Sequence, residues 1–216
     1  SSDVCSSDLY PIDCDTFASA RRLTDPAAPV TIGYVGRIHP EKGVSLLAEA
    51  AAKLATVAGL PPWRLVLCGP TEIPAGGSGP EFLGKIRGVL SQGLKPEQWS
   101  IEPPCFDPQK LADCYRSIDL FCYPSLAAGG ETFGVAIAEA MAAGAVPVVS
   151  SLACFRDLVE DGVSGRVFDH GSHDPAGSLC AVLAELLTQK EAERGKMRGA
   201  AVGVARRYDF PRYVDT

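Results

Sequence analysis

Short apolar runs alternate with segments of helical periodicity from residue 30 to the end of the chain. The apolar runs are typical of buried strands; they are TIGYVG (31–36), RLVLCG (64–69), DLFCYPS (119–125) and AVPVVS (145–150), with weaker strands at 99–102 and 166–168. Helical spacing predicts helices over 43–57, 80–90, 107–117, 132–143, 153–160, 175–188 and 191–208. Asp107 and Pro108 are typical of a helix start, as N-cap and first helical residue.

This alternation predicts a doubly wound, Rossmann-like α/β domain with a parallel sheet of about six strands. Strands that are apolar throughout and separated by helices indicate a sheet covered on both faces, with right-handed connections. Such sheets bind ligands at the carboxyl ends of their strands. We therefore expect the polar and glycine-rich segments that follow strands to lie on one rim; they are 36–43, 104–108, 125–134 and 150–157.

Composition narrows the class of partner. The chain of 216 residues is 46% hydrophobic and 21% charged, so it can form a packed core. Its net charge of -6 argues against nucleic acid or an anionic membrane as the main partner. No apolar run is long enough to span a membrane, and no secretory signal is visible. Without a CxxC pair, the eight cysteines indicate reduced core residues of a cytosolic protein; they are at positions 5, 14, 68, 105, 114, 122, 154 and 180.

The segment GRIHPEKG, residues 36–43, is a candidate phosphate site. Gly36 permits a tight turn, and Arg37 and Lys42 lie on one short loop that leads into a helix N-terminus. Two cations beside free backbone N–H groups suit a diphosphate. The segment matches neither the P-loop nor the GxGxxG fingerprint, which argues against those nucleotide sites. The alternative is a surface loop with solvated charges.

The segment GGETFG, residues 129–134, is a candidate for a second anion site. It precedes a helix whose first N–H groups lack intrahelical acceptors, those of Phe133, Gly134 and Val135. Glu131 precedes the helix, so we expect it to point into the crevice. Glu139 lies on the same helix face as Thr132 and Val135, where its carboxylate can accept hydrogen bonds from a diol such as a ribose. The alternative makes Glu131 a helix cap and Glu139 the partner of a polar group in the core.

With these segments the sequence resembles the retaining glycosyltransferases of the GT-B fold, family 4 type. GRIHPEKG is similar to the family's G-R-(x)3-E-K-G loop, and RLVLCG to its second strand. The other matches are LADCYRSIDLFCYPSL, the E-x7-E segment ETFGVAIAEAMAAGAVPVVSS and the turn DGVSGRVFD. The order and spacing of the five blocks agree from about residue 10 to the C-terminus, which is more specific than any single block.

The resemblance also implies a domain organisation. YPIDCDTF resembles the family's interdomain segment, so residues 10–29 are expected to be a linker and 30–216 the domain that binds the nucleotide-sugar donor. It implies that the N-terminal acceptor domain is absent from this chain. Residues 1–9, SSDVCSSDL, match one reading frame of a common sequencing adapter, and we expect a non-native tail there. The alternative is a natural polar tail.

Carried over by position, the family implies a role for each candidate. Arg37 and Lys42 hold the donor diphosphate, and Glu131 contacts hydroxyls of the transferred sugar. Glu139 binds the ribose, and Phe106 lies near the base, although Glu102-Pro103-Pro104 departs from the family's usual glycine there. The remaining donor-binding positions are Gly36, Thr132, Phe133, Gly134 and Val135.

The implied reaction transfers a sugar from a UDP-, GDP- or ADP-sugar to a sugar, lipid or other glycoconjugate acceptor, with retention of configuration. Cations and helix N-termini stabilise the leaving phosphate, so no metal or cofactor is expected. The fragment alone is expected to have no transferase activity. The protein is expected to be cytoplasmic, with an acceptor domain able to bring it to the inner face of the membrane as a peripheral protein. The alternatives are a nucleotide-binding domain without catalysis and a GT-B-related epimerase or phosphorylase. His170 and His173 are expected in a solvated loop, not a metal site.

Overall fold

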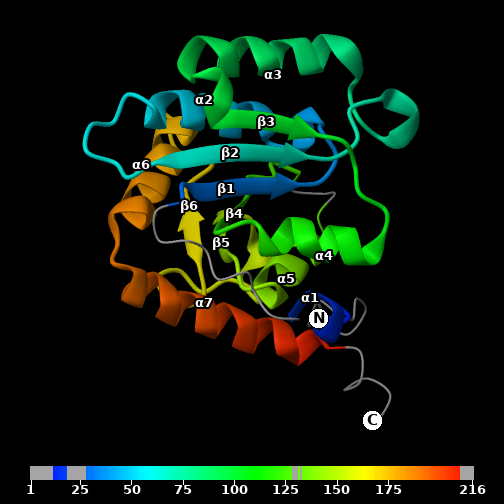
Figure 1. Ribbon diagram of the computed structural model, residues 1–216, viewed down its shortest axis with the longest axis vertical. Helices are drawn as coiled ribbons and strands as arrows, with labels where there is room; N and C mark the ends of the chain where they lie inside the picture. Colours follow the sequence, from blue (N-terminus) through cyan, green and yellow to red (C-terminus); the bar gives the residue numbers. More distant parts are fainter. Residues whose placement is uncertain (1–11, 19–27, 128–130, 132, 210–216) are drawn as a thin grey trace, which may run out of the picture.

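The computed structural model describes residues 12–18, 28–127, 131 and 133–209. Its centre is one six-stranded sheet in the order β3-β2-β1-β4-β5-β6 (Figure 1), and every pairing is parallel. This confirms the predicted sheet. The strands are β1 (Val30–Val35), β2 (Trp63–Cys68), β3 (Trp99–Glu102), β4 (Leu120–Tyr123), β5 (Val146–Ser150) and β6 (Arg166–Phe168).

Helices connect the strands and form two groups, which confirms the doubly wound arrangement. α2 packs against α3 and α6, whereas α5 packs against α7, α4 and α1. The strand order runs outward from β1 in both directions, so right-handed connections place the two groups on opposite faces of the sheet. The helices are α1 (Cys14–Ala18), α2 (Val44–Leu54), α3 (Gly79–Gly93), α4 (Pro108–Arg116), α5 (Val135–Ala142), α6 (Pro175–Thr188) and α7 (Glu191–Ala205).

The core lies against the central strands. β4 and β5 are buried along their whole length, and β1 is buried from its second residue, because helices cover both of their faces. β3, at the edge of the sheet, is partly exposed. The predicted start of α4 is confirmed, since the Asp107 carboxylate accepts a hydrogen bond from the Lys110 N–H at 2.9 Å.

The predicted helix over 153–160 is wrong, because only a short 3-10 turn forms at Ala153–Phe155. The Ser164 hydroxyl accepts from the Glu160 N–H at 2.9 Å, so a side chain takes a backbone donor that a helix would use. The predicted helix over 132–143 begins later, at Val135, since Gly134 is its N-cap with a φ of +82°. The last helix ends at Ala205, and a 3-10 turn, Arg206–Tyr208, follows it.

The described part of the predicted linker packs on the C-terminal end of the chain. The Ile12 N–H donates to the Tyr208 carbonyl at 2.8 Å, and the Cys14 N–H donates to the Asp209 carboxylate at 3.1 Å. Figure 1 shows α1 beside the end of α7 accordingly. The predicted tail over 1–9 and the candidate Thr132 lie outside the described residues.

Candidate functional site

The strand order changes direction at β1 and β4, and the loops that follow these two strands are joined there. The Leu126 N–H donates to the Glu41 carbonyl at 2.8 Å. Gly43, with a φ of +69°, packs so closely that a Cβ would lie 1.9 Å from the Pro124 carbonyl oxygen. The loop after β5 joins them, since the Ser150 hydroxyl donates to the Ser125 carbonyl at 2.6 Å. The prediction of a shared rim is confirmed for these three loops, at the point where doubly wound sheets bind ligands.

The centre of this rim is a buried ion pair between Lys42 and Glu131. The Lys42 ammonium, on the loop after β1, contacts Oε1 of Glu131, on the loop after β4; their side chains are 10% and 6% exposed. The same oxygen accepts from the Ser125 hydroxyl at 2.9 Å and the Tyr123 hydroxyl at 3.1 Å. Burial, reinforced by the Glu131 charge, raises the pKa of Tyr123 and keeps its phenol a donor. That Glu131 points into a ligand crevice stays a prediction, whereas the helix-cap alternative is wrong, since Gly134 is the N-cap.

Arg37 lies at the other end of the loop after β1 and is partly exposed. Its guanidinium pairs with the Glu41 carboxylate. The Tyr34 hydroxyl donates to the Arg37 carbonyl at 2.7 Å and so fixes the backbone that carries the guanidinium. The two cations predicted for a diphosphate are therefore both on this loop, and each faces a carboxylate.

Glu139 lies within α5 and faces the core. Its Oε2 accepts from the Tyr115 hydroxyl at 2.8 Å. Burial raises the pKa of the Glu139 carboxyl, and the hydrogen bond from Tyr115 lowers it by a smaller amount. The alternative that Glu139 has a polar partner in the core is confirmed as a contact. A role toward ribose stays a prediction.

The other predicted donor-binding residues that the structure describes in this segment, Phe133, Gly134 and Val135, lie at the start of α5. Phe133 is buried, and its ring meets the Tyr208 ring edge-on at 4.8 Å between centroids. Gly134 starts the helix, and Val135 is at its first position with 36% of its surface exposed. The first-turn N–H groups of such a helix point toward the rim.

A cleft of about 460 Å³ extends the rim beyond the ends of β2 and β3. Phe106 does not line it, and its side chain is 83% exposed. The predicted role of Phe106 near a nucleotide base stays a prediction. The lining residues are Gly69, Pro70, Thr71, Glu72, Ala75, Leu83, Arg87, Ile101, Glu102, Pro103 and Pro104.

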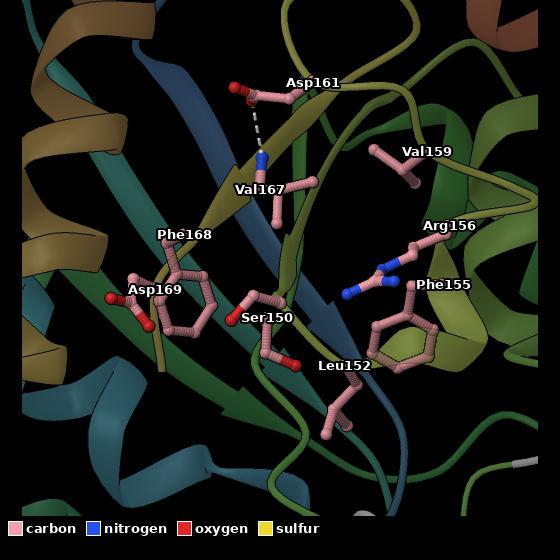
Figure 2. Close-up of a pocket in the computed structure, with 10 residues that line it drawn as sticks. Ser150, Leu152, Phe155, Arg156, Val159, Asp161, Val167, Phe168 and Asp169 are labelled. Carbon is pink, nitrogen blue, oxygen red and sulfur yellow. Dashed lines mark hydrogen bonds between the residues drawn. The ribbon is translucent and has the colours of Figure 1, made fainter. Parts of the chain in front are cut away.

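A second cavity, of about 450 Å³, lies beyond β5 and β6. Figure 2 shows the Arg156 guanidinium directed into it, with Asp161 and Asp169 on the opposite side. Sequence reasoning assigned no role to these residues; the polar segment 150–157 was the available signal. Beside it, the Ser151 hydroxyl lies 2.8 Å from His170 Nδ1, and His170 is partly exposed in a loop whose neighbouring residues Asp169 and Gly171 are exposed. Within the described ranges, no three His, Cys, Asp or Glu residues are grouped as a metal site.

The comparisons with known proteins agree with this geometry. Residues 19–200 match the family model described as glycosyl transferases group 1. The chain belongs to this family. It is 32% identical over 211 residues to a phosphatidyl-myo-inositol mannosyltransferase of Mycobacterium tuberculosis. The matched region covers 92% of this chain and 49% of the relative. The chain therefore spans about half the length of the curated relatives it matches.

Solved structures show the same fold. The C-terminal domain of a glycosyl transferase group 1 family protein from Francisella tularensis superimposes with a TM-score of 0.70 at 22% identity, covering 92% of this chain and 99% of that domain. The Anabaena protein HepE, solved with UDP and glucose, gives a TM-score of 0.73 at 20% identity over 95% of this chain and 53% of its own. The fold is therefore the C-terminal half of a GT-B fold. No helix in the described part of the chain is long and apolar enough to cross a membrane.

Proposed function

We propose that this domain binds the donor of a retaining glycosyltransferase, a nucleoside-diphosphate sugar. The observation that carries the proposal is the Lys42–Glu131 pair, because it places a cation and a carboxylate together where the strand order reverses. HepE, a protein of the same fold, was solved with UDP and glucose, which supports this ligand class.

The pair offers both groups that such a donor needs. Lys42 and Arg37 attract the diphosphate and stabilise the charge that develops on it as the sugar leaves. Among the described residues, the three side-chain hydrogen bonds of Glu131 all reach Oε1, which leaves Oε2 to accept from hydroxyls of the sugar. Glu139 accepts from the ribose, Phe106 lies near the base, and Gly36 together with residues 132–135 supplies backbone contacts. We assign no metal to this site.

The acceptor belongs to the rest of the protein in this proposal. The relatives are about twice as long as the chain, and residues 10–29 link the donor domain to an acceptor domain outside it. The acceptor is a sugar, a lipid or another glycoconjugate; the relative named for phosphatidyl-myo-inositol supports a lipid-linked one. Cys14, Cys68, Cys105, Cys114, Cys122 and Cys180 are free thiols, which supports a cytoplasmic location, with the acceptor domain peripheral to the membrane.

A thermal-shift panel with UDP, GDP, ADP and NAD tests donor binding by the full chain. A ligand at about a hundred times its Kd stabilises by about 2.7 kcal/mol, which raises the Tm by roughly 5–10 °C here. Lys42→Ala should abolish the shift. Lys53→Ala is the matched control, because Lys53 pairs with Asp174 at 2.9 Å on the exposed surface and should leave the shift intact.

The outcomes separate the alternatives. A shift with NAD alone would contradict the proposal, and so would a nucleoside-diphosphate shift that Lys42→Ala retains. Incubated with the matching nucleotide sugar and simple acceptors, the chain alone should release no nucleoside diphosphate, and turnover would show that the acceptor domain is dispensable. The binding-only alternative predicts that the full-length protein also lacks turnover.

A further inference from the structure

The cavity of about 450 Å³ beyond β5 and β6 has no part in the proposed donor site. Its volume lies within the range of small-molecule sites, about 300–1,000 Å³. Serines and charged residues line it together with five apolar side chains, those of Leu152, Phe155, Val159, Val167 and Phe168. All of these apolar residues except Val167 are buried, so they form a preformed wall. This combination is typical of a site for a small molecule that has both polar and apolar surface.

Arg156 provides a positive charge in this cavity. Figure 2 shows its guanidinium directed into the space, and the residue is exposed. Within the described ranges, no hydrogen bond or ion pair engages this guanidinium. A planar guanidinium donates two parallel hydrogen bonds to the oxygens of a phosphate, and arginine is the preferred side chain for such groups. The cavity therefore offers a binding position for a phosphate.

The two carboxylates on the opposite side of the cavity differ in their partners. Oδ1 of Asp161 accepts from Arg166 Nε at 3.0 Å and from the Val167 N–H at 2.8 Å, so a neighbouring cation balances its charge. Oδ1 of Asp169 accepts from the Gly171 N–H at 2.9 Å. A carboxylate has about four acceptor positions, so Asp169 can also accept from hydroxyl groups. The cavity thus combines a cation for a phosphate with an acceptor for hydroxyls.

This cavity is adjacent to the Lys42–Glu131 pair. Ser150 lines the cavity, and its hydroxyl donates to the Ser125 carbonyl at 2.6 Å. The Ser125 hydroxyl in turn donates to Glu131 Oε1 at 2.9 Å. A single residue, Ser125, therefore connects the cavity wall to the carboxylate that we assign to the transferred sugar. A molecule in the cavity lies next to that sugar, which is the position that an acceptor requires.

We propose that this cavity binds part of the acceptor, and that this part is a phosphate ester of a sugar or polyol. Arg156 binds the phosphate, Asp169 accepts from hydroxyls, and the apolar wall packs against C–H groups. The acceptor domain holds the rest of the acceptor. In the transfer, an acceptor hydroxyl oxygen bonds to the anomeric carbon, the bond from that carbon to the donor phosphate breaks, and the hydroxyl proton leaves with the nucleoside diphosphate. This inference rests on the proposed function, because it assigns the acceptor of the same site.

Calorimetry on the full chain without nucleotide tests the site, with glucose 6-phosphate, glycerol 3-phosphate, glucose and inorganic phosphate as probes. At least one of the two esters should bind more tightly than glucose and inorganic phosphate. Arg156→Gln should weaken that binding by about tenfold to a hundredfold, because a hydrogen bond to a charged group changes a binding constant by roughly that factor. Arg156→Lys, which keeps the charge but not the planar fork, should bind with intermediate affinity.

Two controls separate binding from folding. Arg207→Gln replaces an exposed arginine outside the cavity and should leave ester binding unchanged. Because Arg156 is exposed, the Tm of Arg156→Gln without ligand should equal that of the wild type. The backbone amide resonances of Val167 and Phe168 should shift with the ester that binds, which places the probe in the cavity, and not with glucose.

The phosphate ester has two possible sources, a free sugar phosphate and the head group of a lipid. Sedimentation with vesicles distinguishes them: a lipid source predicts that the chain binds phosphatidylinositol in phosphatidylcholine vesicles, that it does not bind phosphatidylcholine alone, and that Arg156→Gln abolishes the binding. If neither the esters nor these vesicles bind, or if Arg156→Gln binds them as well as the wild type, the inference is overturned. Inorganic phosphate that binds as tightly as both esters would also overturn it, since the sugar or polyol would then contribute nothing.

Turnover by the full-length enzyme tests the acceptor role. Arg156→Gln should raise the KM for a phosphorylated acceptor by about tenfold or more and leave the KM for the nucleotide sugar unchanged. A raised KM for the donor alone would overturn the assignment to the acceptor. Failure of the proposed function has a different signature, because nucleoside diphosphates would then cause no thermal shift, whereas ester binding is measured without them.

Discussion

Replacing Lys42 by methionine removes the positive charge from the buried pair with Glu131 and keeps most of the side-chain volume. The Glu131 carboxylate, 6% exposed, then keeps the hydroxyls of Ser125 and Tyr123 as partners but has no counter-charge. Breaking a buried pair from one side costs about 3–5 kcal/mol of unfolding free energy. Because the two hydroxyls remain, we expect a cost near the lower end, about 3 kcal/mol.

The assay is urea and thermal unfolding of wild type, Lys42→Met, Glu131→Gln and the double variant. A cost of about 3 kcal/mol lowers the Tm by roughly 6–12 °C in a domain of this size. The double variant should recover much of the loss, because it leaves no unpaired charge. Lys53→Met, which breaks an exposed pair, should change stability by less than about 1 kcal/mol.

Two results would refute the reasoning. One is a Lys42→Met variant as stable as Lys53→Met, which would mean that Glu131 is well solvated in the folded chain. The other is a double variant as unstable as Lys42→Met alone, which would mean that lost packing, and not the unpaired carboxylate, causes the destabilisation.

Three further predictions concern the framework of the site. Glu139→Gln should cost less stability at about pH 7.5 than at about pH 4. Burial raises the pKa of Glu139 in the folded state, so the stability that this carboxyl contributes is lost as the pH rises through that pKa, where the unfolded chain binds fewer protons. The opposite trend in urea midpoints would contradict this prediction. Gly43→Ala should destabilise the chain by more than about 2 kcal/mol, because the new Cβ would meet the Pro124 carbonyl and the φ of residue 43 is +69°. Gly84→Ala, at an open position within a helix, should stabilise it by about 0.5–1 kcal/mol. Equal Tm values for the two variants would count against the close approach of Gly43 to Pro124. Asp107→Ala should cost about 1 kcal/mol through loss of the α4 cap, with Gln109→Ala, at an exposed position of the same helix, as a control near zero; an unchanged denaturation midpoint would show that the cap is dispensable.

Much of the fold followed from local sequence. Strands 99–102 and 166–168 and the helix over 175–188 were predicted with the bounds they have in the structure. Periodicity sufficed there because burial dictates both which residues are apolar and how they are spaced. It failed over 153–160, where the Ser164 hydroxyl, several residues further along the chain, takes a backbone donor of the segment.

The sequence by itself determined the chemical types at the site and their order along the chain. Lys42 and Glu131 stood out because each lies in a glycine-containing segment that follows a strand, and parallel strands bring such segments to one rim. Their pairing could not be predicted, since it joins residues 89 positions apart through the register of β1 against β4.

Tertiary structure alone decided which groups are buried and what they contact. Packing gave Glu139 a partner in Tyr115 and directed Arg156 into a cavity (Figure 2). The sequence did not identify these particular neighbours, because each depends on how a helix or turn docks on the sheet. A pattern along the chain specifies which face of an element is buried, whereas the neighbours on that face are fixed only when the layers pack.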